Sequence, residues 1–280
     1  MKHGKTIQIY LADGNPRGIK IAEVTSRTIQ AILIPRSEIE QSLKRNELEN
    51  VGVYFLIGID ESDGKSILYI GEAEDCKQRL KQHNRSKDFW NYALIIISKT
   101  QFFTKSHVKF LEWFCYDTAK KNNRYKIDNS SIPTKPYIPE SIQSDLMDNF
   151  DTIKLLVSAL GYPIFDQIAK SNKQNIIICK GKDAVAKGEY TEEGLAVFKG
   201  SICNLNETKT AGPWVIGMRT KLINTGVLKE KNETLILMED HLFSSPSAAA
   251  AVVLGRRANG WTEWKYENGK TLDEVKRKNT

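Results

Sequence analysis

The sequence predicts an α+β protein of two small domains. The chain has 280 residues, a length that is sufficient for two domains. In its first half, short apolar runs typical of strands alternate with basic segments of helical spacing. Three prolines between residues 130 and 140 then indicate the exit from one domain, and an alanine-rich segment among further strand-like runs indicates a second. We expect four parts: a β-rich N-terminal segment with a short helix (1–48), a first domain (49–130), a proline-containing linker with a bridging helix (131–175) and an accessory α+β domain (176–280).

The elements before residue 130 follow from apolar runs and capping residues. Residues 19–23 and 28–34 have strand-like content, and Ser37 can cap a helix that runs to about residue 45. Residues 51–59 predict a buried strand that turns at 60–64 into a second strand at 67–70, which makes a hairpin. The remaining expected elements are a helix capped by Asp75, a strand at 92–98 and a helix at 105–121.

The second half begins with a predicted helix at 141–160 that ends at Gly161. A strand is expected at 176–179 after the polar residues 170–174, and another at 194–201. Further on, Ser245 and Ser247 can cap an alanine-rich helix that Pro246 initiates. Gly255 is expected to end this helix, and a tight turn at 259–260 is expected to lead into a strand that carries Trp261 and Trp264.

The net charge of +7 is concentrated in one region. Residues 77–126 contain twelve Lys and Arg residues but only three Asp and Glu residues, so the rest of the chain is nearly neutral. A cationic stretch of this kind fits a polyanion such as nucleic acid, and the alternative is a solvated basic face that aids solubility. The residues that we expect to bind nucleic acid are Lys77, Lys81, Arg85, Lys105 and Lys109, joined in the second domain by Arg256 and Arg257.

Two short tripeptides, Gly52-Val53-Tyr54 and Tyr69-Ile70-Gly71, each lie at the edge of an apolar run. Arg79 and His83 follow the second tripeptide at helical spacing, and Glu112 lies on a later basic helix. Together these segments supply two phenols, a guanidinium, an imidazole and a carboxylate, which are groups that can cut a phosphodiester. The alternatives are strand aromatics at both tyrosines, a solvated face at Arg79 and His83, and an ion pair of Glu112 with a lysine of its helix.

The ordered set resembles the GIY-YIG endonuclease domain over residues of roughly 50–130. The resemblance implies a small three-stranded antiparallel sheet flanked by helices and a metal-dependent endonuclease that hydrolyses phosphodiester bonds. It also implies Mg²⁺ or Mn²⁺ as the cofactor and DNA as the partner, with RNA left open. The segments 243–255 and 259–265 resemble an uncharacterised C-terminal domain that often accompanies such nucleases. A packed accessory domain and a DNA-contacting domain both fit this second resemblance.

The resemblance also implies a role for each residue. Glu112 would hold one Mg²⁺ or Mn²⁺ through a single carboxylate, and Arg79 would donate to the phosphate oxygens. Tyr54 or Tyr69 would orient or deprotonate the attacking water, with a phenol pKa that neighbouring cations lower. His83 could share that role as a base.

Three further positions support the same interpretation. Gly52 and Gly71 allow close packing or the approach of phosphate beside the tyrosines. Family members often carry an asparagine after the metal-binding helix; Asn122, Asn123 and Asn129 all qualify, and we favour Asn129 because it starts the loop after the helix. Glu72 departs from the family pattern, which often has a lysine or another polar residue there, and leaves the identity of the general base open. It also motivates the alternative of a nucleic-acid-binding protein on this scaffold with weak or no catalysis; an adaptor that contacts a partner protein is a further alternative.

The remaining composition indicates a cytoplasmic protein. The longest apolar stretch, residues 93–97, is far shorter than the roughly 20 residues that a membrane span needs, and the N-terminal residues show no signal-peptide core. The four cysteines lack CxxC spacing, so we expect buried free thiols and no zinc site. Restriction and repair are both compatible pathways. The sequence leaves the oligomeric state open.

Overall fold

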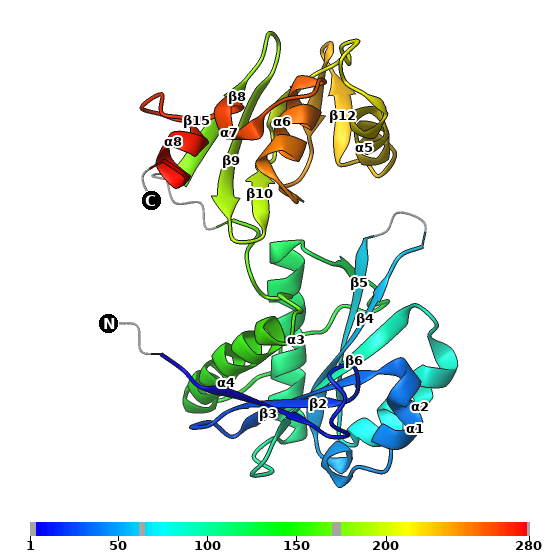
Figure 1. The fold of residues 1–280 in the computed structure, drawn as a ribbon. Helices are drawn as coiled ribbons and strands as arrows, with labels where there is room; N and C mark the ends of the chain where they lie inside the picture. The colour runs from blue at the N-terminus through cyan, green and yellow to red at the C-terminus, as the bar shows by residue number, and fades with distance from the viewer. Residues whose placement is uncertain (1–3, 62–64, 170–174, 279–280) are drawn as a thin grey trace. The chain divides into compact units, whose positions relative to one another are not determined.

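The computed structural model describes residues 4–61, 65–169 and 175–278, and Figure 1 traces them. The chain forms two compact units, residues 1–166 and 167–280. Both units mix helices with a β-sheet, so the predicted α+β class is confirmed. The turn expected at 60–64 and the polar stretch expected at 170–174 lie partly or wholly outside the described residues.

The first unit contains a seven-stranded sheet with the order β1-β2-β3-β6-β4-β5-β7. All neighbouring strands are antiparallel except β5 and β7, which are parallel. The strands are β1 (Ile7–Leu11), β2 (Lys20–Val24), β3 (Ile29–Pro35), β4 (Gly52–Ile59), β5 (Ser66–Ala73), β6 (Trp90–Ser98) and β7 (Lys126–Ile127).

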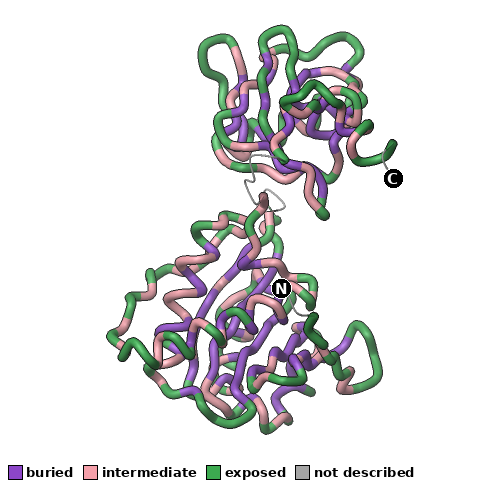
Figure 2. The backbone as a smooth tube through the Cα atoms, turned by 90° about the vertical axis from the view of Figure 1, so that its left-hand side faces the viewer, coloured by how far each residue is buried: buried purple, intermediate pink, exposed green. Residues whose placement is uncertain are grey.

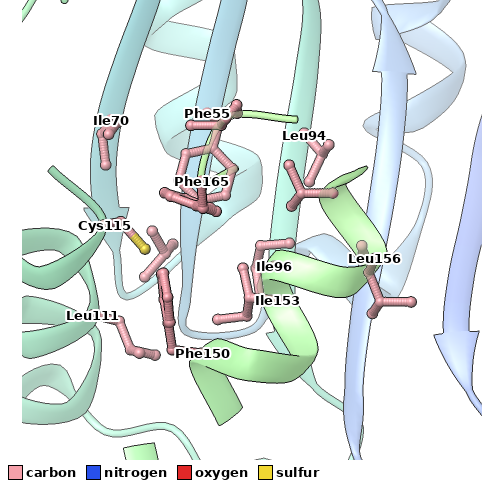
Figure 3. Close-up of a cluster of buried hydrophobic side chains, with 14 of the residues drawn as sticks. Phe55, Ile70, Leu94, Ile96, Leu111, Cys115, Phe150, Ile153, Leu156 and Phe165 are labelled. Atoms are coloured by element: carbon pink, nitrogen blue, oxygen red, sulfur yellow. The ribbon is translucent and has the colours of Figure 1, made fainter. Parts of the chain in front are cut away.

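Two long helices cover one face of this sheet. They are α3 (Lys105–Asn122) and α4 (Glu140–Ala159). Residues of α4 at helical spacing, among them Phe150 and Ile153, meet Phe55 of β4 and Ile96 of β6 in a continuous apolar cluster (Figure 3). Side chains of a strand alternate between faces, so Phe55 points into this cluster whereas Tyr54 points to the other face.

Shorter helices cover the opposite face. They are α1 (Ile39–Ser42), α2 (Cys76–Ser86) and the 3-10 turns η1 (Arg36–Glu38) and η2 (Asn46–Glu49). Leu80 of α2 and Leu56 of β4 belong to the apolar cluster on this side. The side chain of Asp75 caps α2 by accepting from the N–H of Gln78, as predicted. Because both faces are covered, the central strands are almost continuously buried (Figure 2).

The first unit differs from the prediction in three respects. The three expected strands are β4, β5 and β6, but the N-terminal segment extends the same sheet, because β3 pairs with β6 along seven residues. The single helix expected from Ser37 is broken into two 3-10 turns and one turn of α-helix, and Ser37 does not cap it. This stretch contains few apolar residues. Its conformation therefore depends on tertiary contacts and not on helix propensity. The helix expected to bridge the domains, α4, packs inside the first unit.

The second unit contains an eight-stranded antiparallel sheet. Six strands follow the order β12-β13-β11-β9-β10-β14, and β8 joins β9 on one side and β15 on the other. The strands are β8 (Ile176–Lys180), β9 (Val185–Thr191), β10 (Gly194–Val197), β11 (Ile202–Asn204), β12 (Leu228–Lys231), β13 (Thr234–Leu237), β14 (His241–Phe243) and β15 (Trp264–Tyr266). The helices are α5 (Pro213–Asn224), α6 (Pro246–Leu254), α7 (Gly260–Glu263) and α8 (Leu272–Lys276).

The alanine-rich helix α6 forms the centre of this unit. Ser245 caps it by accepting from the N–H of Ala248, and Gly255 ends it with a left-handed backbone, as predicted. Trp264 is fully buried and donates its indole N–H to the carbonyl of Pro246 at 3.1 Å. The prediction that Trp261 lies on a strand is wrong. Asn259 caps the short helix α7, and Trp261 belongs to this helix.

All four cysteines are buried free thiols, as expected from their spacing. Among the described residues, no helix is both long enough and apolar enough to cross a bilayer.

Candidate active site

Four of the predicted catalytic residues come together on the face of the first sheet that α2 covers. The hydroxyl of Tyr54 on β4 lies 2.8 Å from Nε2 of His83. The Nε of Arg79 donates to the same hydroxyl at 3.0 Å. Tyr69 on β5 completes the group, with its ring centroid 6.1 Å from that of Tyr54 and 5.1 Å from that of His83. The four-residue spacing of Arg79 and His83 thus places both on one side of α2.

The two glycines of the tripeptides make room for this cluster. Gly71 lies opposite Tyr54 in the β4–β5 register, and a Cβ on Gly71 would come within 2.3 Å of the Tyr54 hydroxyl. A Cβ on Gly52 would lie 2.5 Å from the carbonyl oxygen of Ile96 and 2.9 Å from Sγ of Cys76. Of the two interpretations predicted for these glycines, close packing is the one that the contacts support.

Burial decides the protonation states in the cluster. Burial and the charge of Tyr69 raise the pKa of Tyr54 well above its ordinary value, although Arg79 opposes this shift. Burial, with the cationic Arg79 and Lys87, lowers the pKa of His83 to about 4. Tyr54 is therefore a phenol near neutral pH and His83 is uncharged. The expectation of a lowered phenol pKa is wrong for Tyr54, because desolvation outweighs the neighbouring cation.

Arg79 and His83 both hydrogen-bond to the hydroxyl of Tyr54. The Tyr54 oxygen accepts from Arg79, whereas the donor in its hydrogen bond with Nε2 of the neutral His83 depends on the tautomer of His83. The other ring nitrogen of His83, Nδ1, is buried and has no hydrogen-bond partner among the described residues. The hydrogen bond to Tyr54 in turn raises the pKa of Arg79, which stays charged. The chain Arg79–Tyr54–His83 therefore holds the guanidinium at a defined position.

Tyr69 is the more accessible of the two phenols. Its side chain is partly exposed, whereas Tyr54 retains only 2% of its exposure. The ammonium of Lys87 lies 4.5 Å from the centre of the Tyr69 ring, a cation–π distance. Of the two tyrosines, Tyr69 is therefore the one that a substrate can reach without displacing the cluster.

Glu112 lies on α3, which packs against β5 from the other face of the sheet. Burial, then the carboxylate of Glu72, raises the pKa of Glu112 to about 7, and Lys105, Lys109 and Arg79 oppose this rise. Glu112 is thus near enough to Arg79 and Glu72 for their charges to act on it. Among the described residues, no hydrogen bond or ion pair joins Glu112 to the tyrosine cluster.

The alternative of an ion pair between Glu112 and a lysine of its own helix is not what the structure shows. The ammonium of Lys105 lies 3.0 Å from Glu72 and 3.4 Å from Glu74, both on or beside β5. Within the described part of the chain, Glu112 has no ion pair and no hydrogen bond from its side chain. A half-buried carboxylate without a partner is costly in a purely structural role.

Asn129 contacts the second tripeptide directly. Its amide oxygen accepts from the N–H of Ile70 at 3.0 Å, and its amide nitrogen donates to the carbonyl of Ile70 at 2.7 Å. Ile70 is the central residue of that tripeptide, so Asn129 continues the pairing that β7 makes with β5. The asparagine that the resemblance favours therefore positions the strand of Tyr69.

Ion pairs occupy part of the basic stretch. Lys77 pairs with Glu49 at 2.8 Å, and Lys105 pairs with Glu72 as described above. By contrast Lys81, Arg85 and Lys109 are exposed and have no carboxylate partner among the described residues. In the second unit Arg256 pairs with Glu263 at 2.7 Å, while Arg257 is exposed. The positive charge that is available to a nucleic acid is consequently smaller than the number of basic residues in the sequence indicates.

Sequence reasoning missed two neighbours of the site. Lys87 was counted only as part of the basic stretch, although its distance of four residues from His83 places it one turn beyond His83, at the residue that ends α2. Lys105 was assigned to nucleic acid, whereas it lies between two carboxylates of another element. The helical spacing of Lys87 could have indicated its contact with the site. The contacts of Lys105 depend on the packing of α3 on β5, which no pattern in the sequence indicates.

Comparisons with known proteins identify two regions. Residues 50–126 match the family model described as the GIY-YIG catalytic domain, and residues 177–276 match a domain of unknown function, DUF4357. The first match includes all five predicted catalytic residues and ends three residues before Asn129. Comparisons with curated proteins and with solved structures returned no match.

Proposed function

Because the chain carries a GIY-YIG catalytic domain of a nuclease family, followed by a DUF4357 domain, we propose that it is a divalent-metal-dependent endonuclease that hydrolyses phosphodiester bonds in DNA. The observation that carries the proposal is the hydrogen-bonded cluster of Arg79, Tyr54 and His83, together with the unpaired carboxylate of Glu112, on which the charge of Arg79 acts. A partly exposed guanidinium held by a buried phenol–imidazole pair has little purpose in a passive fold, and it suits the recognition of phosphate.

The residues present fit a divalent cation. Glu112 is a half-buried carboxylate without a partner, and the charge of Glu72 acts on it. Mg²⁺ and Mn²⁺ prefer carboxylate oxygens and keep several waters, so one or two carboxylates are a sufficient protein contribution. We therefore assign the cation to Glu112, with Glu72 in support. When bound, such an ion neutralises charge on the reacting phosphate and its leaving oxygen.

The other groups bind and orient the substrate. Arg79 donates from its guanidinium to the non-bridging phosphate oxygens, while Tyr54 holds its Nε in place. The raised pKa of Tyr54 makes it a positioning group and not a base. Tyr69, which is more accessible, is the phenol that we assign to the attacking water. The exposed Lys81, Arg85 and Lys109 hold flanking phosphates.

One observation favours a second candidate, a nucleic-acid-binding protein on the same scaffold with weak or no catalysis. The Lys105 ammonium already neutralises Glu72, at 3.0 Å, on the side where the cation is assigned. If this ion pair persists in the complex, the metal affinity falls and binding without cleavage results.

A plasmid assay tests the proposal. We expect the wild-type chain to nick or linearise supercoiled DNA with Mg²⁺ or Mn²⁺, and to lose this activity in EDTA. Glu112→Ala should abolish cleavage and retain DNA binding, with an unchanged melting temperature as the check on folding. Thr118→Ala, on the same helix, is the matched control and should cleave normally. Binding by the wild type without cleavage in either metal would select the second candidate.

The protonation of Glu112 gives an expected pH dependence. Only the ionised carboxylate binds a cation, and in the metal-free protein its pKa is about 7. The apparent Mn²⁺ affinity should therefore rise with pH and level off above about pH 8, and at pH 6 it should be roughly tenfold below that plateau. Calorimetric Mn²⁺ titrations between these pH values measure the effect. The Glu112→Gln variant should lack both the strong Mn²⁺ site and the rise of its affinity with pH. An equal rise in this variant would assign the proton to another group.

A further inference from the structure

The second unit presents an exposed basic and aromatic surface along α5, the helix that Figure 1 labels. We call it the α5 surface; its members are Lys209, Trp214, Gly217, Lys221 and Arg257. We propose that the α5 surface binds single-stranded or locally unpaired DNA, with a base stacked on Trp214 and phosphates held by the three cations. The choice of DNA rests on the proposed function, whereas the argument for a nucleic-acid strand rests on the surface itself.

The charge around α5 is of one sign. Segments 208–229 and 248–262 contain no Asp or Glu. Two of their arginines are neutralised by carboxylates outside the segments, Arg219 by Glu207 and Arg256 by Glu263, each at 2.7 Å. Lys209, Lys221 and Arg257 are exposed, and within the described residues none of them has a carboxylate partner. These three cations are therefore available to an anionic partner.

The loop that carries Lys209 is fixed against the end of α6. The N–H of Thr208 donates to the carbonyl of Gly255 at 2.8 Å, which places this loop beside Arg257. A Cβ on Gly212, the residue before α5, would lie 3.0 Å from the guanidinium of Arg257. Arg257 thus lies against Gly212 at the start of α5, two residues before Trp214.

Open space lies beside Gly217, one turn along α5 from the exposed indole of Trp214. The side chain of Trp214 is 46% exposed, and Lys221 lies two turns further along the same edge of α5. Gly217 lies between them, and nothing is within 4 Å of where its Cβ would be. The absence of a side chain at this point leaves space beside the indole for a planar group.

This combination suits an unpaired strand better than a duplex. Bases stack on an aromatic side chain when their faces are accessible, and cations on the same surface hold the phosphates that connect them. In a duplex the base faces are covered by their neighbours. A protein partner would instead use the opposite edge of α5, where Ile216 and Ile223 are exposed.

The experiment uses the full-length chain with Glu112→Ala, so that the probe is not cut. Fluorescence anisotropy measures the affinity for a labelled single-stranded oligonucleotide, the same sequence as duplex DNA, and the same sequence as RNA. In this background, Trp214→Ala should lose roughly 5- to 150-fold in single-strand affinity, and Trp214→Phe should retain most of it. Gly217→Gln fills the open space without disturbing the fold and should also weaken binding. Arg257→Ala should reduce the salt dependence by about 0.7 in the log–log slope.

Ile223→Ala is the matched control, because it removes a similarly exposed apolar side chain from the other edge of α5. It should leave the single-strand affinity unchanged. The proposal is overturned if Trp214→Ala binds like its parent, if Ile223→Ala loses as much, or if duplex affinity falls equally. A preference for RNA over DNA overturns the choice of polymer. Failure of the wild type to cleave DNA would overturn the proposed function and leave these binding results intact.

Discussion

Replacing Arg79 with alanine is expected to slow DNA cleavage about a thousand-fold, the lower end of what an arginine that stabilises a reacting phosphate contributes. The guanidinium is held by Tyr54 and by Oε1 of Gln82, each at 3.0 Å, so no neighbouring cation can replace it at the same position. Single-turnover cleavage of a plasmid or a labelled duplex measures the rate. Arg79→Lys should recover little activity, since an ammonium lacks the fork that contacts phosphate and Tyr54 together.

Gln78→Ala is the control for this variant. Gln78 is exposed and directly precedes Arg79 on α2, and its contact with the cap is made by the backbone N–H. It should cleave at the wild-type rate. If Arg79→Ala and Gln78→Ala behave alike while both remain folded, Arg79 has no role in the chemistry and the cluster is structural.

The largest expected loss of stability is at Arg219 in the second unit. This side chain is fully buried and satisfies its guanidinium with four partners: Glu207, and the carbonyls of Asn204, Leu205 and Val252. Arg219→Ala removes the donors and leaves these acceptors without them. We expect a loss of about 3–5 kcal/mol, the range for breaking one side of a buried charged network.

Hydrogen exchange followed by mass spectrometry can assign this loss to the correct unit. Amides of β11 and α6 should exchange much faster in Arg219→Ala, while those of β4 and β6 in the first unit should stay protected. Lys221→Ala, an exposed cation on the same helix, should change the stability by less than about 0.5 kcal/mol. Equal protection of β11 in the variant and the wild type would contradict the anchoring role of Arg219.

The sequence predicted the first unit better than the second, for a physical reason. Strands β4, β5 and β6 are buried on both faces, and their apolar runs are unmistakable. In the second unit, strands such as β12 (LKEK) and β11 (ICN) are short and owe their conformation to their neighbours in the sheet. The capping residues Asp75 and Ser245 were predicted correctly because a cap depends on local sequence.

At the candidate site, the sequence indicated which residues meet but not how their environment changes them. Helical spacing was sufficient to bring Arg79 and His83 together. The raised pKa of Tyr54 depends on burial that only the complete sheet and α2 produce, so spacing could not reveal it. The pairing of Lys105 with Glu72 is likewise a contact between distant segments, which a count of charges cannot resolve.

The amide of Asn129 has a consequence for the outer edge of the first sheet. Strand β7 has only two residues, and beyond it the main chain of β5 would present an open donor and acceptor at Ile70. Asn129 occupies both, which a carboxylate could not do, since it has no proton to give. A side chain thereby shields this rim against strand addition by another copy of the chain.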